Sequence, residues 1–311
     1  MDLFSPASRD DAISLILTHR PQPDTPGQRL LFEQPSLGRV FDNGQRAPER
    51  VWAVRGSDPG AHGLVAGRLL GDLALVDMIA LPADDDAAAL LAHAATSWAR
   101  SAEEAVVSFE SAAVTDTLDD PAVTRVVETF GAVGWQVRVT RRHYQLGAEV
   151  AAPHSAAVPL SMNLEQARPG DEQRLTDLLT RVLPGSLDVS DRELVAQHGL
   201  AAAAAQQVDD LLEDDPVECI RIATIAGADV GLISWRLMPR GRGYVLTVGV
   251  AVEHRGRGLA GELVAAATRD LVAAGAHTLI ADTDDENVGM IRGFARAGWQ
   301  PTEARIDLTL V

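Results

Sequence analysis

Residues 250 to 260 read Val250-Ala251-Val252-Glu253-His254-Arg255-Gly256-Arg257-Gly258-Leu259-Ala260, an apolar strand pattern followed by a glycine-arginine turn and the beginning of a helix. Small residues at 256, 258 and 260 let the backbone approach a ligand closely. The first N–H groups of the helix have no partner within it, and they would point at that ligand with the positive end of the helix dipole. The stretch therefore predicts a phosphate-binding turn for an anionic cofactor.

Gly256, Gly258 and Gly261 also satisfy the GxGxxG fingerprint of dinucleotide-binding folds. In those folds the strand runs almost directly into the first glycine, and several further βα units follow. Here three polar residues intervene after Val252, and only residues 262 to 311 remain. Asp282 lies about 20 residues past the glycines, where such folds have a ribose-binding acid, so the dinucleotide alternative stays open. A third interpretation is that the glycines only begin an ordinary helix.

Two motifs carry a resemblance to a known family. Residues 255–260 resemble the R/Q-x-x-G-x-G/A pyrophosphate loop of the GCN5-related N-acetyltransferase (GNAT) superfamily, which begins the central helix after the fourth strand. Residues 287–299, Asn287-Val288-Gly289-Met290-Ile291-Arg292-Gly293-Phe294-Ala295-Arg296-Ala297-Gly298-Trp299, are similar to its N-x-x-A-x-x-x-Y-x-x-x-G-F helix. The resemblance implies an α+β (mixed α/β) fold with a mostly antiparallel central sheet flanked by helices. It also implies acetyl-CoA, or another acyl-CoA, as co-substrate and no metal.

The resemblance assigns cofactor-binding positions. Pantetheine would pair with the fourth strand near Val250 and Val252, and Asn287 would lie near the pantetheine arm. The pyrophosphate would lie on the loop residues Arg255, Gly256, Arg257, Gly258, Leu259 and Ala260. Two arginines on a glycine turn of an acidic chain also favour phosphate binding by their side chains. Asn287 has an alternative role as the N-cap of the helix that follows it.

The residues for proton transfer are less clear. Many members of the superfamily have a Tyr seven residues after the motif Asn, but this chain has Phe294, which cannot donate a proton. Tyr244 is a conceivable replacement. Residues 244–250 contain no carboxylate that could act as a general base, so Asp282 and Asp284 are the candidates, directly or through water. A solvated acidic loop over residues 282–286 is the competing interpretation, and His254 is a further candidate with a suitable ordinary pKa.

A repeated motif indicates a duplication. Phe130-Gly131-Ala132-Val133-Gly134-Trp135-Gln136 recurs as Phe294-Ala295-Arg296-Ala297-Gly298-Trp299-Gln300, and each copy is expected to close a helix and open a strand. We expect two tandem GNAT-like domains, a degenerate one over 1–147 and an acyl-CoA-binding one over 160–311, joined by an Ala- and Pro-rich linker over 148–159. In the first domain Asp84-Asp85-Asp86 stands where the second has its glycine-arginine turn, and these acids would repel pyrophosphate.

Periodic patterns place the elements of both halves. In the first half we expect strands over 51–55, 63–70 and 73–81 and a helix over 87–100. In the second half we expect helices over 171–183, 191–212, 258–274 and 287–297, with strands over 218–225, 230–238, 244–252 and 277–283.

Composition excludes several classes of function. The 311 residues carry a formal net charge of −17, so no nucleic-acid partner is expected. No run approaches the roughly 18 apolar residues of a membrane helix, and residues 1–20 lack the features of a signal peptide, so we expect a cytoplasmic protein with no membrane partner. Cys219 is the only cysteine, which allows no intramolecular disulfide.

These observations lead to a hypothesis about function. We expect an acyl-CoA-dependent N-acyltransferase, a monomer or homodimer, that moves an acetyl group from acetyl-CoA to a primary amine of a small cationic molecule. The amine would attack the thioester directly in a ternary complex. The alternative is a non-catalytic acyl-CoA-binding or interaction protein, favoured by Phe294 and by the degenerate first domain.

Overall fold

The computed structural model describes residues 1–20, 25–32, 34–56, 62–214 and 216–311. The chain divides into two compact units, one comprising residues 1–140 and 303–311 and the other residues 141–302. This division differs from the expected domains over 1–147 and 160–311, because residues 141–147 belong to the second unit and the last nine residues belong to the first. The expected linker is also structured, since Ala148–Ala157 forms helix α6.

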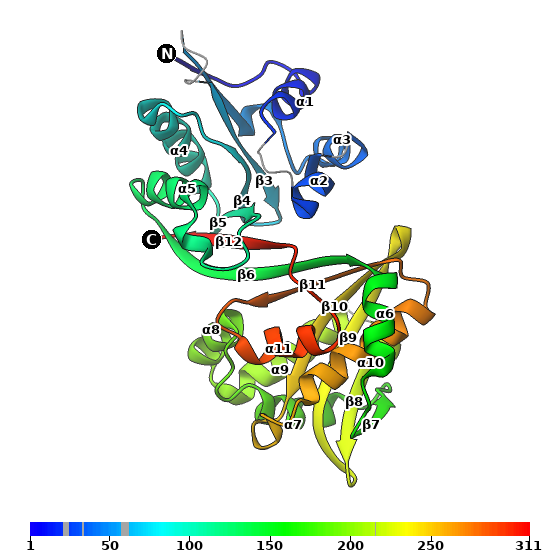
Figure 1. Cartoon of the computed structure of the whole chain (residues 1–311). Coiled ribbons are helices and arrows are strands. Elements are labelled where there is room, and N and C mark those ends of the chain that lie inside the picture. Colours follow the sequence, from blue (N-terminus) through cyan, green and yellow to red (C-terminus); the bar gives the residue numbers. More distant parts are fainter. Residues whose placement is uncertain (21–24, 33, 57–61, 215) are drawn as a thin grey trace. The chain divides into compact units, whose positions relative to one another are not determined.

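The first unit is built on a mostly antiparallel sheet (Figure 1). Its strands, in the order β1-β2-β3-β4-β5-β12, are β1 (Asp2–Phe4), β2 (Val51–Arg55), β3 (Gly63–Leu70), β4 (Leu73–Ala80), β5 (Glu104–Ser111) and β12 (Glu303–Leu310). Among the described pairings of these strands, only that of β4 with β5 is parallel. Its helices are α1 (Arg9–Thr18), α2 (Pro26–Phe32), α3 (Gln34–Asp42), α4 (Asp85–Ala99) and α5 (Pro121–Gly131). One apolar cluster packs α4 and α5 on the sheet, and a second packs α1 and α3 on it.

The second unit repeats this plan. Strand β6 spans Trp135–Gly147, and its part from Arg141 begins a sheet in the order β6-β11-β10-β9-β8-β7. The other strands are β7 (Asn163–Gln166), β8 (Ile220–Ile225), β9 (Ala228–Met238), β10 (Arg242–Val250) and β11 (Thr278–Asp284). Its further helices are α7 (Glu172–Val182), α8 (Val189–His198), α9 (Leu200–Asp214), α10 (Leu259–Ala273) and α11 (Val288–Arg296). Helices α6, α10 and α11 share one core with the sheet, and α7 and α9 share another.

The expected fold class is confirmed, whereas some boundaries differ. Of the pairings between β6 and β11 and along β7 to β11, only that of β10 with β11 is parallel. This sheet excludes the dinucleotide-binding alternative, which requires consecutive parallel βα units. The helix expected over 191–212 is two helices, because Gly199 adopts a φ of 78° between α8 and α9. Strand β10 ends at Val250, so Val252 lies in a short 3₁₀ turn.

The two halves of the chain exchange their last strands. Each copy of the repeated motif ends a helix as expected. The strand after the first copy, β6, pairs with β11 over Arg141–Gly147, in the second unit. The strand after the second copy, β12, pairs with β5 over Ala304–Thr309, in the first unit. This exchange is the physical reason that the unit boundaries differ from a simple division at the linker.

Candidate functional site

The second unit contains a cavity of about 780 Å³, a size typical of small-molecule sites. Its walls come from the α7–α8 connection, α9, β10, the turn over residues 254–258, the start of α10, the end of β11 and α11. The glycine turn that the sequence singled out is therefore part of the wall of a cavity large enough for a cofactor and a small acceptor.

The turn has the backbone conformation that the sequence predicts. Gly256 and Gly258 adopt φ values of 75° and 81°, in the left-handed region that favours glycine. Gly258 is the N-cap of α10 and provides no side-chain cap. The first turn of α10 therefore presents its N–H groups and the positive end of its dipole at the cavity wall, which is suited to an anion.

In the corresponding turn of the first unit, side chains of the same unit already bond the backbone groups at the start of the helix. Asp84 caps α4 by accepting a hydrogen bond from the N–H of Ala87 at 2.8 Å. Arg125 donates to the carbonyl oxygens of Pro82 and Ala83 and pairs with Asp85. The carboxylates that replace the glycines satisfy the helix start internally, as the sequence predicts for a degenerate copy.

The side chain of Arg255 is engaged with backbone carbonyl oxygens. Its guanidinium donates to the carbonyl oxygens of Val182, Pro184 and Gly185 and to that of Val250. The side chain therefore fastens the glycine turn to the end of α7. Arg257 is exposed, and its guanidinium donates to the carbonyl oxygen of Glu253 at 3.2 Å.

We expect Arg255→Lys to lower the stability of the second unit nearly as much as Arg255→Ala does. Lys keeps the charge but cannot donate to four carbonyl oxygens at once. If the Lys variant loses one or two net hydrogen bonds worth about 1 kcal/mol each, its free energy of unfolding should fall by about 1–2 kcal/mol. Urea titrations measure this difference. Full stability in the Lys variant would show that charge, and not the bonding geometry, is what matters at this position.

Two arginines of α11 line the cavity and were not expected there. Arg292 and Arg296 share a helix face with Gly289 and Gly293, and all four line the cavity. Arg296 donates to the carbonyl oxygen of Gly258 at 3.3 Å and lies 3.7 Å from Glu262. The spacing of Gly289, Arg292, Gly293 and Arg296 is the sequence signal, because residues three and four apart share one side of a helix.

Glycines also allow α10 and α11 to lie close together. A Cβ at Gly293 would lie 3.3 Å from the backbone N of Gly261 and 3.4 Å from the Cβ of Ala260. The third glycine of the GxGxxG pattern therefore serves helix packing.

Asn287 lines the cavity and also caps α11, since its Oδ1 accepts a hydrogen bond from Met290 N at 3.2 Å. Both roles expected for Asn287 are compatible with this geometry.

Strand β10 provides an open strand edge in the cavity. It pairs with β11 only over Arg242–Tyr244, and residues 245–250, beyond that pairing, line the cavity. A bulge between Val245 and Val248 interrupts its pairing with β9, and Thr247 N donates to Ser234 Oγ at 3.2 Å. Val250 lines the cavity as expected, whereas Val252 is 49% exposed and lies outside the lining.

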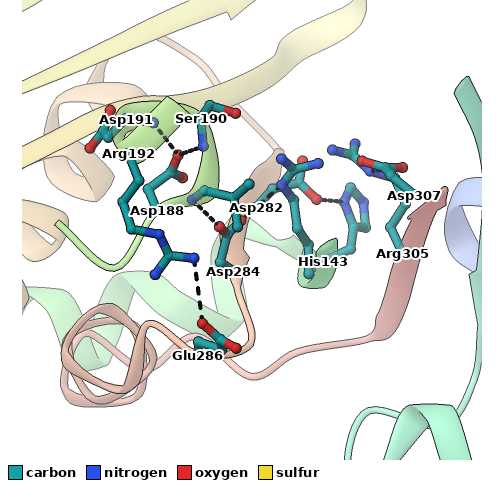
Figure 2. Close-up of polar contacts among 12 residues, drawn as sticks. His143, Asp188, Ser190, Asp191, Arg192, Asp282, Asp284, Glu286, Arg305 and Asp307 are labelled. Carbon is teal, nitrogen blue, oxygen red and sulfur yellow. Dashed lines mark hydrogen bonds and ion pairs between the residues drawn. The ribbon is translucent and has the colours of Figure 1, made fainter. Parts of the chain in front are cut away.

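Not all of the candidate residues for proton transfer line the cavity. Asp282 lines the cavity, and its Oδ1 lies 2.9 Å from His143 Nδ1 (Figure 2). Tyr244 and Asp284 do not line it. Asp284 is buried, pairs with Arg141 at 3.0 Å and accepts a hydrogen bond from Val189 N at 2.7 Å. Burial raises its pKa. Asp284 therefore has a structural role at the start of α8.

The neighbouring acids are also paired. Asp285 pairs with Arg142 at 2.6 Å. Glu286 lies 3.5 Å from Arg192, and Figure 2 draws this ion pair. The interpretation of residues 282–286 as only a solvated loop is therefore incomplete, since most of these carboxylates form ion pairs. His254 lines the cavity beside the glycine turn.

Phe294 lines the cavity, and its environment is aromatic. Its ring lies 4.5 Å from that of Tyr144, and both rings contact Trp299. Tyr144 is fully buried, and burial raises the pKa of its hydroxyl to about 12. The position expected to hold a proton donor therefore holds an apolar ring packed in the core.

The comparisons with known proteins agree with this fold. Residues 186–299 match the model of the Acetyltransferase (GNAT) family. A GCN5-related N-acetyltransferase from Sphaerobacter thermophilus has a TM-score of 0.60 at 16% identity, over 99% of this chain and 94% of that one. A GNAT-family acetyltransferase from Colwellia psychrerythraea has a TM-score of 0.50 at 12% identity, over 100% of both chains.

A tandem GNAT protein from the clavulanic acid biosynthesis pathway has a TM-score of 0.50 at 17% identity, over 99% of this chain and 98% of that one. At such identities the likeness shows the fold, which is a tandem GNAT fold. The sequence also resembles mycothiol synthase in having tandem domains with one degenerate copy, and that analogy stays a prediction. No curated protein matches the chain.

Among the residues with described placement, no helix has the length and apolarity needed to cross a bilayer. Over the same residues, no group of three or more His, Cys, Asp or Glu side chains could hold a metal ion.

Proposed function

We propose that this chain, which carries a GNAT-family domain over residues 186–299, is an acyl-CoA-dependent N-acyltransferase. In this proposal it transfers an acetyl group to a primary amine of a small cationic molecule. The observation that carries the proposal is the uncapped start of α10, with left-handed Gly256 and Gly258, in the wall of a 780 Å³ cavity. Membership in an acetyltransferase family supports acyl-CoA as the donor.

The residues present fit an acyl-CoA. The N–H groups from Gly256 to Ala260 would hold the pyrophosphate, and a Cβ at Gly256 would meet no atom within 4 Å, so the turn is open to a ligand. Arg292 and Arg296 line the cavity and add positive charge, and exposed Arg257 lies on the adjoining glycine turn. The open edge of β10 would hold the pantetheine amides. When bound, the acyl-CoA supplies an activated thioester. The site of its acyl group would be the part of the cavity near Phe294.

The acceptor must lose a proton before its nitrogen can attack the acyl carbon. Asp282 is the expected candidate that lines the cavity, and its contact with His143 would hold the carboxylate in place. The leaving thiolate needs little help, because a simple thiol has a pKa near 8.5. Having Phe294 at this position therefore removes a proton donor whose contribution to the rate can be as small as about 10²-fold. Direct attack of the amine on the thioester in a ternary complex remains the proposed mechanism.

The second candidate is an acyl-CoA-binding protein without turnover. It is favoured by one observation, that Phe294 lines the cavity at the position of the expected proton donor while Tyr244 lies outside the lining. A protein that binds acetyl-CoA and releases no thiol with any amine would have this function.

Calorimetric titration with acetyl-CoA, CoA and NADH tests the proposal. We expect the first two to bind and NADH not to bind, and we expect amines to release free CoA thiol from acetyl-CoA. Absence of CoA binding would contradict both candidate functions. Binding without amine-dependent thiol release, over a panel of monoamines, polyamines and amino sugars, would support the second candidate.

A further inference from the structure

Asp191 is a cavity-lining carboxylate that neutral groups hold in place. It lies in the first turn of α8, where its Oδ2 accepts a hydrogen bond from Ser186 Oγ at 2.6 Å and its Oδ1 accepts one from Gln207 Nε2 at 2.5 Å. Among the described residues, no cation forms an ion pair with it, and the more distant charge of Arg255 lowers its pKa less than burial raises it. Burial raises its pKa, because removal from water disfavours the charged form. A carboxylate in this setting is stabilised by a ligand that brings positive charge.

The other carboxylates of the cavity differ from Asp191. Asp188 caps α8, with its Oδ1 accepting hydrogen bonds from the N–H groups of Ser190 and Asp191, as Figure 2 shows. Asp282 contacts His143. Asp210 is exposed on α9. Within the described part of the chain, Asp188 and Asp191 are the half-buried lining carboxylates with only neutral hydrogen-bond partners, and Asp188 already serves as the cap of α8.

Apolar side chains lie in the same cavity wall. Leu187 and Leu246 are 41% and 47% exposed, and both line the cavity. Leu187 is four residues before Asp191, and Leu246 lies in the bulge of β10. Exposed leucines in the wall of a cavity offer apolar contact to a ligand. Arg236 also lines the cavity and would repel a second positive charge on that ligand.

We propose that Asp191 binds the ammonium group of the acceptor, and that the acceptor is a singly charged amine with an apolar substituent lying against Leu187 and Leu246. This inference rests on the proposed N-acyltransferase function and narrows its substrate class. It distinguishes the acceptor from polyamines and amino sugars, which carry polar or charged groups where this cavity offers leucines.

Three amines of one chain length test the substrate class on the unaltered protein. Hexylamine, hexane-1,6-diamine and 6-aminohexanoate carry the same amine and end in a methyl group, a second ammonium or a carboxylate. We expect kcat/KM for acetylation to be highest for hexylamine, about tenfold above the diamine, since about 1.4 kcal/mol of apolar contact corresponds to that ratio. Equal or greater activity with the diamine or the amino acid would overturn the assignment.

Asp191→Asn tests the residue. It keeps the shape of the side chain and removes the charge, so we expect KM for hexylamine to rise about tenfold or more while KM for acetyl-CoA stays unchanged. The matched control is Asp209→Asn, which removes one charge from an exposed position of α9 outside the cavity. An equal rise in KM in both variants would assign the effect to overall charge and overturn the role of Asp191.

A second variant covers the case in which Asp191→Asn fails to fold. Leu246→Asn alters an exposed side chain, and we expect it to reduce the preference for hexylamine over the diamine to about twofold. Calorimetry separates this inference from the proposed function. If acetyl-CoA binds and amines are acetylated without dependence on Asp191 or on the apolar tail, the inference fails alone. If acetyl-CoA does not bind, both fail.

Discussion

Gly258→Asp is expected to eliminate most of the affinity for acetyl-CoA while the second unit stays folded. The variant places at the start of α10 the residue type that caps α4, where Asp84 accepts the Ala87 N–H. A carboxylate there would satisfy the N–H groups that are proposed to hold the pyrophosphate, and it would repel the phosphates. Two unit charges 4 Å apart near a protein surface interact with about 4 kcal/mol, so even strong screening leaves a large effect.

Gly258→Asn is the matched control. Both side chains would be strained to a similar extent by the φ of 81°, and both would meet Arg296 Nη1, which is the far end of a flexible side chain. Asn and Asp are the residues other than glycine that adopt the left-handed region most readily, so the difference between the variants reports mainly the charge. Calorimetry should show a dissociation constant for acetyl-CoA at least about tenfold higher for Asp than for Asn.

Salt provides an independent check of the same prediction. Because the effect is electrostatic, the difference between the two variants should narrow as ionic strength rises. Equal affinities in the two variants at low salt would mean that the start of α10 does not bind the phosphates. The circular dichroism of both variants should match that of the unaltered protein.

Local pattern was sufficient for the elements that carry the site. The conformations of Gly256 and Gly258 follow from glycine chemistry within a few residues, and the helix expected over 258–274 is found as α10, Leu259–Ala273. The roles of Arg255 and Asp191 depend instead on partners far along the chain. Arg255 bonds carbonyl oxygens more than 70 residues away, and no pattern around residue 255 reports where the end of α7 lies.

The composition of residues 191–212 also gave no indication that the chain forms a cavity wall around Asp191. Residues 191–212 are rich in helix formers, and this masks the break at Gly199 that separates α8 from α9. Because a single helix was expected over 191–212, Asp191 was not singled out as part of a cavity wall. The pairing of Asp191 with Gln207, 16 residues on, requires the chain to turn between the two helices.

The strand exchange could not be predicted, because the two halves have similar patterns. A strand that follows each copy of the repeated motif would fit the sheet of either half, and its partner depends on contacts that local pattern does not report. The pairing of β12 with β5 shows which sheet the strand joins, with Ile306 opposite Phe109 in the first unit. Glu303, at the start of β12, accepts a hydrogen bond from Gly27 N at 2.9 Å, also in the first unit.

Ile306→Ala is accordingly expected to destabilise the first unit, although residue 306 follows the second copy of the repeated motif. Its side chain is fully buried in the core that contains Val107 and Phe109. Truncating a buried isoleucine costs about 2–5 kcal/mol. Native-state hydrogen exchange should show faster exchange of the amides of β4 and β5, and acetyl-CoA binding by the second unit should be retained.

Leu279→Ala is the matched change in the other sheet. Leu279 is also fully buried, but it lies on β11 in the core shared with α10. We expect this variant to accelerate exchange in β10 and β11 and to weaken acetyl-CoA binding, because α10 rests on that core. If Ile306→Ala instead accelerated exchange in β10 and β11, β12 would belong to the second sheet. The chain would then be a simple tandem repeat, and the cofactor domain would extend to its last strand.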